Sequence, residues 1–317
     1  MDITNYVPKG KIQNKHLLTL KDYSRDEIYE ILLLAEKVKK EYKSGIKNTA
    51  LSGKTLAMIF TKSSTRTRLS FETGMRQLGG YPMFLNGSDL QLGRNEPISD
   101  TAKVISRMGI DGIMIRTYKQ SDVEELSVFG SVPVINGLTD LYHPCQVLAD
   151  LLTAYENFGR LKGLTLAYLG DGNNMAHSYM IACAKLGMDV RIVCPKEYSP
   201  LPEITEYAKS QGKVTVTEDI ESGVLGADII CTDVFFSMGQ EKDEKKERLL
   251  MPYQVNSELM KKTKNPAAIF MHCLPAHRGE EVSADVIDGA QSRVFDEAEN
   301  RLHAQKAVLL LLLSDKK

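Results

Sequence analysis

The sequence predicts an α/β protein built from two similar, consecutive domains, each with a central, mostly parallel sheet flanked by helices. Short apolar runs alternate with helical patterns along most of the chain, which is typical of βαβ units around a parallel sheet. A second series of this kind begins after the segment at residues 159–163. The chain has 317 residues, 43% of them hydrophobic, which is enough to form two cores.

The first series opens with an amphipathic helix at residues 26–42, where apolar residues recur at helical spacing between charges. Short apolar runs and helical patterns then alternate. The expected strands are residues 55–60, 81–85, 112–118 and 133–138. The expected helices are residues 66–78, 100–108, 121–129 and 144–158.

The second series contains five apolar runs with helices between them. We expect these strands at residues 164–169, 190–194, 214–217, 229–234 and 268–273. The border between the domains should lie within or just after the helix at residues 144–158. The last helix, at residues 297–313, is more apolar than a surface helix should be, so we expect it to be buried and to bridge both domains.

One connection, at residues 235–255, is longer than the others and contains a dense run of charges. One interpretation is a solvated loop or an exposed helix. Another is a lid or binding loop, because long loops in compact domains are often functional. The segment starts at the carboxyl end of an expected strand, where ligands bind in open α/β sheets. Both interpretations stay open.

Composition and charge favour a small-molecule partner over a polyanion. Lys and Arg number 40 and Asp and Glu 41, so no net field attracts nucleic acid or an anionic membrane. The five cysteines are odd in number and lack CxxC spacing, so we expect no disulfide framework and no zinc site. The start of the chain lacks the pattern of a signal peptide, and the apolar run at residues 307–313 is far shorter than the roughly 20 residues of a membrane span. We therefore expect a cytoplasmic protein.

The segment "SSTRTRLSFE" at residues 63–72 joins an expected strand to an expected helix. Unpaired backbone N–H groups and the helix dipole favour an anion at such a junction. Ser64, Thr65 and Thr67 add hydroxyl donors, and Arg66 adds a charged bidentate fork. Capping explains single hydroxyls, but it does not require arginines, so the cluster predicts a phosphate or carboxylate ligand. Arg68 suits an ion pair equally well.

Three other motifs follow expected strands. "LGDGNNMAHS" at residues 169–178 resembles a dinucleotide fingerprint but lacks its third glycine. Of Asn173 and Asn174, we expect one to cap a helix and the other to serve a ligand. "HPCQ" at residues 143–146 combines an imidazole with an amide, and "MHCLPAHRGEE" at residues 271–281 places Cys273 beside His272. Adjacent residues of a strand face opposite sides, so we do not expect these two to form a dyad.

Together these segments resemble the aspartate/ornithine carbamoyltransferase family, in order and along nearly the whole chain. "SSTRTR" resembles the family's carbamoyl-phosphate loop, and "HPCQ" resembles its carbonyl-polarising motif. "DVFFSMG" and "MHCLPAHRGEE" resemble the motifs of its ornithine branch, although Phe235-Phe236 stands where many relatives have a tryptophan. The resemblance implies a carbamoyl-phosphate domain at residues 1–148, an ornithine domain at 149–298, and a C-terminal helix, 299–317, that returns to the first domain.

The resemblance also implies a role for each matching residue. Those for phosphate and carbamoyl binding are Ser64, Thr65, Arg66, Thr67, Gln91 from a neighbouring subunit, Arg116, His143, Gln146, Cys273, Leu274 and Arg301. Those for ornithine are Asn174, Asp233, Ser237 and Met238. Of these two sets, the expected catalytic residues are Arg116, His143, Gln146, Asp233 and Cys273. A homotrimer, or a multiple of trimers, with shared active sites is implied, and neither a metal nor an organic cofactor is expected.

The implied reaction transfers the carbamoyl group of carbamoyl phosphate to the side-chain amine of L-ornithine, giving L-citrulline and phosphate in arginine metabolism. Three alternatives are a sister carbamoyltransferase acting on putrescine or an acylated ornithine, a non-catalytic scaffold that has kept the fold, and a dinucleotide-dependent oxidoreductase. The sequence does not distinguish a biosynthetic from a catabolic direction.

Overall fold

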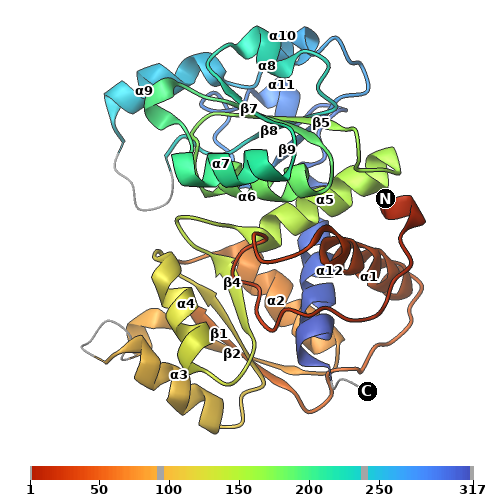
Figure 1. The fold of residues 1–317 in the computed structure, drawn as a ribbon, viewed down its shortest axis with the longest axis vertical. Helices are drawn as coiled ribbons and strands as arrows, with labels where there is room; N and C mark the ends of the chain where they lie inside the picture. Colours follow the sequence, from red (N-terminus) through yellow and green to blue (C-terminus); the bar gives the residue numbers. More distant parts are fainter. Residues whose placement is uncertain (1, 91–95, 237–241, 315–317) are drawn as a thin grey trace. The chain divides into compact units, whose positions relative to one another are not determined.

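The computed structural model describes residues 2–90, 96–236 and 242–314 (Figure 1). Internal contacts divide the chain into two compact units. The first unit comprises Tyr6–Leu152 with Glu299–Lys317, and the second comprises Met1–Asn5 with Thr153–Ala298. The borders fall inside two helices, α5 (Pro144–Phe158) and α12 (Val294–Leu313).

The first unit is built on a sheet of parallel strands in the order β2-β1-β3-β4. The strands are β1 (Thr55–Phe60), β2 (Tyr81–Asn86), β3 (Gly112–Arg116) and β4 (Val134–Leu138). The strands β1, β3 and β4 are buried along nearly their whole length, whereas the edge strand β2 is only partly covered. Continuous apolar runs fit strands that are covered on both faces.

Helices cover both faces of this sheet. They are α1 (Arg25–Lys43), α2 (Thr65–Gln77), α3 (Ile98–Arg107), α4 (Gln120–Phe129), the start of α5 and most of α12. Buried residues of α3 and α4 form one cluster with Ile59 and Ile113 of the strands. On the other face α12 approaches β3 so closely that a Cβ at Gly112 would lie 2.7 Å from Leu313.

The C-terminal helix α12 packs beside α1 and α2 (Figure 1). The Nζ of Lys39 in α1 donates to Asn300 Oδ1 at 2.7 Å, and the Nζ of Lys306 donates to Gln77 Oε1 of α2 at 3.1 Å. The predicted return of the last helix to the first domain is therefore confirmed.

The second unit contains a second parallel sheet, in the order β7-β6-β5-β8-β9. Its strands are β5 (Thr165–Leu169), β6 (Asp189–Val193), β7 (Val214–Thr217), β8 (Ile229–Thr232) and β9 (Ile269–His272). Its helices are α6 (Asn174–Lys185), α7 (Pro202–Gln211), α8 (Ile220–Val224), α9 (Glu244–Leu250), α10 (Ser257–Lys262) and α11 (Ala284–Ile287).

The helices of this unit form a layer on each side of the sheet. The helices α6 and α7 lie on one side (Figure 1). On this side the ring of Tyr168 in β5 contacts that of Tyr179 in α6. The helices α8, α10 and α11 lie on the other, in one cluster with Leu169 and Phe270. The short 3-10 helices of the chain are η1 (Ile3–Asn5), η2 (Gly87–Asp89), η3 (Lys196–Tyr198) and η4 (Met251–Tyr253).

These two units confirm the predicted α/β class, with a parallel sheet in each. Four predicted strands end earlier than expected, because β3 stops at Arg116, β6 at Val193, β8 at Thr232 and β9 at His272. Asp233 and Cys273 therefore lie just beyond the sheet. The charged part of residues 235–255 forms α9, with Lys246 and Leu250 buried. None of the helices within the described parts of the chain has the length and apolar content of a membrane span.

Candidate active site

Each sheet has a topological switch point, where adjacent strands lead the chain in opposite directions. In the first sheet this point lies between β1 and β3, and in the second between β5 and β8. Ligands of open α/β sheets bind outside the carboxyl ends of the strands at such points. The described site residues predicted from the sequence lie at or after the ends of β1, β3, β4, β5, β8 and β9, except for Arg301 on α12.

The amino terminus of α2 carries the cluster of hydroxyls and arginines. Ser64 is its N-cap: Oγ accepts the N–H of Thr67 at 3.2 Å and donates to Thr67 Oγ1 at 3.1 Å. Capping is therefore one role of Ser64. A helix start leaves its first N–H groups without partners inside the helix, and the dipole adds positive potential there. Thr65 and Arg66 belong to this first turn, so the end of α2 is suited to an anion.

Arg301 joins this helix end to α5. Its Nη2 donates to Thr67 Oγ1 at 2.7 Å, and its Nη1 donates to Gln146 Oε1 at 3.0 Å. The amide of Gln146 is oriented by a second contact, in which Nε2 donates to Asp150 Oδ1 at 2.8 Å. All four side chains are buried. The planar guanidinium therefore connects two predicted motifs that are far apart in the sequence.

His143 lies in a strongly positive environment. It is 4% exposed, and burial, followed by the charges of Arg301, Arg116, Arg66 and Lys62, holds its pKa well below the usual 6.5. Both effects disfavour the protonated ring. At neutral pH His143 is therefore an uncharged imidazole, able to donate one hydrogen bond without adding charge.

Arg116 ends β3 at an irregularity in the sheet. The pairing with β4 runs from Ile115 opposite Asn136 to Arg116 opposite Leu138, so Gly137 is an extra residue on β4. A Cβ at Gly137 would lie 2.7 Å from a methionine sulfur and 3.1 Å from the carbonyl oxygen of Ile115 in β3, so a side chain here would force its neighbours to shift. Such bulges re-aim the neighbouring side chains, and this one lies next to the 6% exposed Arg116.

In the second unit, Asp233 is the centre of a hydrogen-bonded group. Its Oδ1 accepts the N–H of Val234 at 2.8 Å and the thiol of Cys273 at 3.1 Å. Its Oδ2 accepts Nδ2 of Asn173 at 2.9 Å. Asn173 is also the N-cap of α6, so of Asn173 and Asn174 it is Asn173 that caps the helix. Three strand ends, those of β5, β8 and β9, thus contribute to one site.

His272 supports the turn after β9. Its Nδ1 accepts the N–H of Leu274 at 2.9 Å, which leaves Nε2 to donate to Glu281 Oε1 at 3.1 Å. Leu274 has φ +56°, which is uncommon for a bulky residue. Burial alone would raise the pKa of Glu281, but hydrogen bonds from His272 and from the backbone of His277 hold it below its usual value. Both nitrogens of His272 serve this scaffold, which agrees with the expectation that it forms no dyad with Cys273.

The described residues predicted for the site divide between the two units. The first contains Ser64, Thr65, Arg66, Thr67, Arg116, His143, Gln146 and Arg301, and the second contains Asn174, Asp233, Cys273 and Leu274. Gln91, Ser237 and Met238 lie outside the described residues.

Sequence reasoning missed two further residues. Lys62 is 7% exposed and contributes to the positive charge around His143. Its position in the sequence, two residues before Ser64, could have identified it as part of the same positive cluster. Glu281, fully buried, was visible only as part of the "MHCLPAHRGEE" motif.

Among the residues that the structure describes, two sets of three side chains could each offer ligand atoms within 4.8 Å of one another to a metal ion. They are Asp233 with His272 and Cys273, and His277 with Glu280 and Glu281. The first set has donors that suit zinc. However, the protein hydrogen bonds described above already use both oxygens of Asp233 and both nitrogens of His272. The expected absence of a metal stays a prediction.

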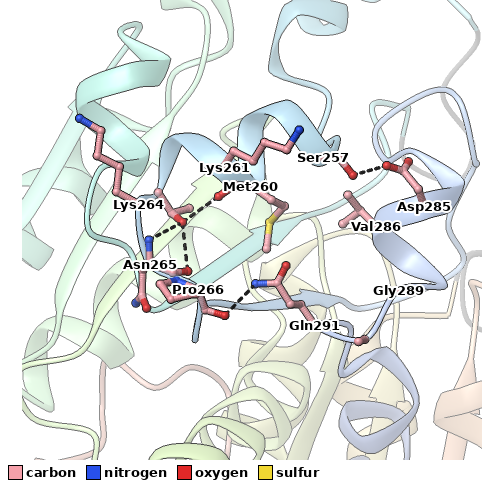
Figure 2. Close-up of a pocket in the computed structure, with 12 residues that line it drawn as sticks. Ser257, Met260, Lys261, Lys264, Asn265, Pro266, Asp285, Val286, Gly289 and Gln291 are labelled. Atoms are coloured by element: carbon pink, nitrogen blue, oxygen red, sulfur yellow. Dashed lines mark hydrogen bonds between the residues drawn. The ribbon is translucent and has the colours of Figure 1, made fainter.

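A cavity of about 570 Å³ lies elsewhere in the second unit, beside α10 and α11 (Figure 2). Met260, Lys261, Asn265, Val286 and Gln291 are among its lining residues. The loop at residues 263–268 leads into the amino end of β9, so this cavity lies away from the carboxyl ends of the strands. It contains none of the predicted site residues.

Comparison with known proteins gives matches along most of the chain. Residues 15–156 match a family model described as the carbamoyl-P binding domain of aspartate/ornithine carbamoyltransferase, and residues 162–312 match its Asp/Orn binding domain. An ornithine carbamoyltransferase of Carboxydothermus hydrogenoformans is 54% identical over 307 residues, or 95% of this chain and 98% of the relative. That of Bacillus subtilis is 54% identical over 314 residues, or 97% of this chain and 96% of the relative. The structure of ornithine carbamoyltransferase from Pyrococcus furiosus has a TM-score of 0.92 and 51% identity, covering 96% of this chain and 98% of that one.

Proposed function

The chain belongs to the aspartate/ornithine carbamoyltransferase family, and we infer that it transfers the carbamoyl group of carbamoyl phosphate to the side-chain amine of L-ornithine. The products are L-citrulline and phosphate, so the enzyme is a carbamoyl-group transferase of arginine metabolism. The observation that carries this conclusion is similarity over nearly the full chain to proteins named ornithine carbamoyltransferase.

The phosphate of the donor binds at the amino terminus of α2 in this proposal. Ser64, Thr65, Arg66 and Thr67 supply hydroxyl, backbone and guanidinium donors, and Arg301 adds a second buried guanidinium. The positive charge that lowers the pKa of His143 supports an anion here, because a bound dianion would offset it. Gln91 of a neighbouring subunit completes the phosphate contacts, as the family resemblance implies.

The carbamoyl group lies within reach of Arg116, His143 and Gln146 in the same unit. Arg116 and the uncharged His143 donate to the carbonyl oxygen, where negative charge develops in the tetrahedral intermediate. Gln146 Oε1 already accepts from Arg301, and its second lone pair can accept from the carbamoyl amide. Thr67 is a further hydroxyl donor to the developing oxyanion.

The acceptor amino acid binds to the second unit. Asp233 and Asn174 contact its α-amino and α-carboxylate groups, together with Ser237 and Met238 of the adjoining segment. Cys273 and Leu274 border the reacting centre and also contact the carbamoyl group. The three hydrogen bonds that Asp233 accepts support this assignment, because they hold its carboxylate at a defined position.

The reaction proceeds by direct attack of the amine, without a covalent enzyme intermediate. An alkyl ammonium with a pKa of about 10.4 costs roughly 4 to 5 kcal/mol to deprotonate at pH 7. Desolvation in the site lowers that cost, because burial disfavours the charged form. The proton passes to Asp233, to Cys273 or to the departing phosphate, and these three routes stay open.

The enzyme acts as a homotrimer, or a multiple of trimers, in the cytoplasm. The resemblance to the family supports this assembly. None of the five cysteines, all within the described residues, forms a disulfide, as is usual in a reducing compartment.

A citrulline assay with carbamoyl phosphate and a panel of amines tests the proposal. The panel contains ornithine, putrescine, N-acetylornithine and aspartate. We expect ornithine to give the highest kcat/KM, and a preference for another amine would replace ornithine as the acceptor. Tight binding of carbamoyl phosphate without turnover of any amine would instead support a non-catalytic scaffold.

A further inference from the structure

A buried ion pair connects α9 to the loop that follows β5. The Nζ of Lys246 lies 2.6 Å from Asp171 Oδ2, and the two side chains are 10% and 15% exposed. The same Nζ lies 5.2 Å from the ring centre of Tyr198 and 5.7 Å from that of Phe236. Its neighbour Lys245 is exposed. Lys246 is therefore distinct from the solvated charges around it.

The carboxylate partner belongs to the loop that carries Asn173. The backbone N–H of Asn173 donates to Asp171 O at 2.7 Å, and that of Gly172 donates to Tyr198 O at 2.8 Å. A Cβ at Gly172 would lie 2.4 Å from the nitrogen of Pro200, so this loop has little room to shift. Asn173 in turn donates to Asp233. A continuous set of contacts thus runs from Lys246 to the acceptor-binding carboxylate.

The charges of Lys246 and Asp233 both affect the pKa of Asp171. Burial raises the pKa of Asp171, the charge of Asp233 raises it further, and Lys246 lowers it. Two carboxylates that repel each other are thus balanced by one buried ammonium. A buried ion pair is weak evidence for stability, because its desolvation penalty can exceed the attraction between its members. A role in placing the neighbouring groups explains the pair better.

We propose that Lys246 is a positioning residue for the ornithine half of the site, acting through Asp171 and Asn173 to hold Asp233 in place. The inference rests on the proposed function. It predicts that the charge of Lys246 affects the use of ornithine much more than that of carbamoyl phosphate, whose phosphate binds to the other unit.

The test is steady-state kinetics of citrulline formation in Lys246→Met, Lys246→Arg and Asp171→Asn, with exposed Lys245→Met as the matched control. Because a misplacement of about 1 Å can cost about 100-fold, we expect kcat/KM for ornithine to fall about 10- to 100-fold in Lys246→Met. We expect the KM for carbamoyl phosphate to change by less than about twofold, and Lys246→Arg to restore part of the loss. The control should behave as wild type.

A second measurement tests whether Lys246 and Asp171 act through the same contact. In the double variant Lys246→Met with Asp171→Asn, the loss should be smaller than the product of the two single losses, since both remove the same contact. Equal effects on both substrates, or unchanged ornithine kinetics, would overturn the inference. If Lys246→Met does not fold, the other two single variants decide the matter. If wild type prefers another amine, the proposed function fails, but KM for that amine still tests the role of Lys246.

Discussion

Replacement of Arg301 tests how the C-terminal helix contributes to the site. Arg301→Lys keeps the positive charge but cannot donate to Thr67 and Gln146 as a planar fork. One hydrogen bond from a charged donor is lost, worth about 1.5 to 3 kcal/mol, which corresponds to about 10- to 150-fold in an equilibrium constant. We expect the KM for carbamoyl phosphate to rise by that factor at saturating ornithine.

Arg301→Met removes the charge as well, so its effect should be larger. Arg301 is the first of the charged groups that lower the pKa of His143, so its loss should raise that pKa toward the usual value. NMR titration of histidine-labelled protein measures this shift, with His143→Gln to assign the resonance. Arg301→Lys should leave the pKa low.

Arg191→Lys is the matched control, because Arg191 is also hydrogen-bonded but lies in the second unit, with Leu225 O as an acceptor at 2.7 Å. It should lower the unfolding temperature without changing the KM for carbamoyl phosphate. If Arg301→Lys keeps that KM within about threefold of wild type, the hydrogen-bonding argument is wrong. If both Arg301 variants give the same pKa for His143, the electrostatic argument is wrong.

Three further predictions concern the other site residues. Arg116→Ala should lower kcat about 100- to 1,000-fold, the usual cost of losing one oxyanion donor, and near-normal turnover would contradict its role. Asp233→Ala should raise the dissociation constant of L-2-aminopentanoate, which is ornithine without its side-chain amine, about 10- to 100-fold. Unchanged affinity would refute that assignment. The folded pKa of His143 lies below its unfolded value of 6.5, so the unfolded chain binds the proton first as the pH falls and stability declines below about pH 6.5. Between about pH 7.5 and pH 5.5 the unfolding temperature should therefore fall less in His143→Gln than in wild type. An equal fall in both proteins would count against the low pKa of His143.

The helices and strands were predictable because their signals are local. An apolar run or a helical spacing identifies a strand or a helix within a few residues, and α1 even shows its capping box, with Ser24 and Glu27 as the reciprocal partners. The candidate anion site at α2 rests on the same kind of signal, since hydroxyls, arginines and a helix start are adjacent in the chain.

Two element-level details required the structure. The early ends of β8 and β9 could not be read from the sequence, because the apolar pattern continues past the last paired residue. The same is true of the bulge at Gly137, which depends on how β3 and β4 pair.

The sequence by itself determined the two α/β units and the positions of the reactive motifs at the ends of strands. Only the tertiary structure decided which of those groups touch: Arg301 reaches Thr67 across 234 residues, and Asn173 reaches Asp233 across 60. It also decided that Lys246 is buried against Asp171, although the run of charges to which it belongs has the sequence pattern of a solvated segment. The physical reason is that periodicity and capping depend on neighbours in the chain, whereas the partner of a buried polar group is chosen by packing between distant segments.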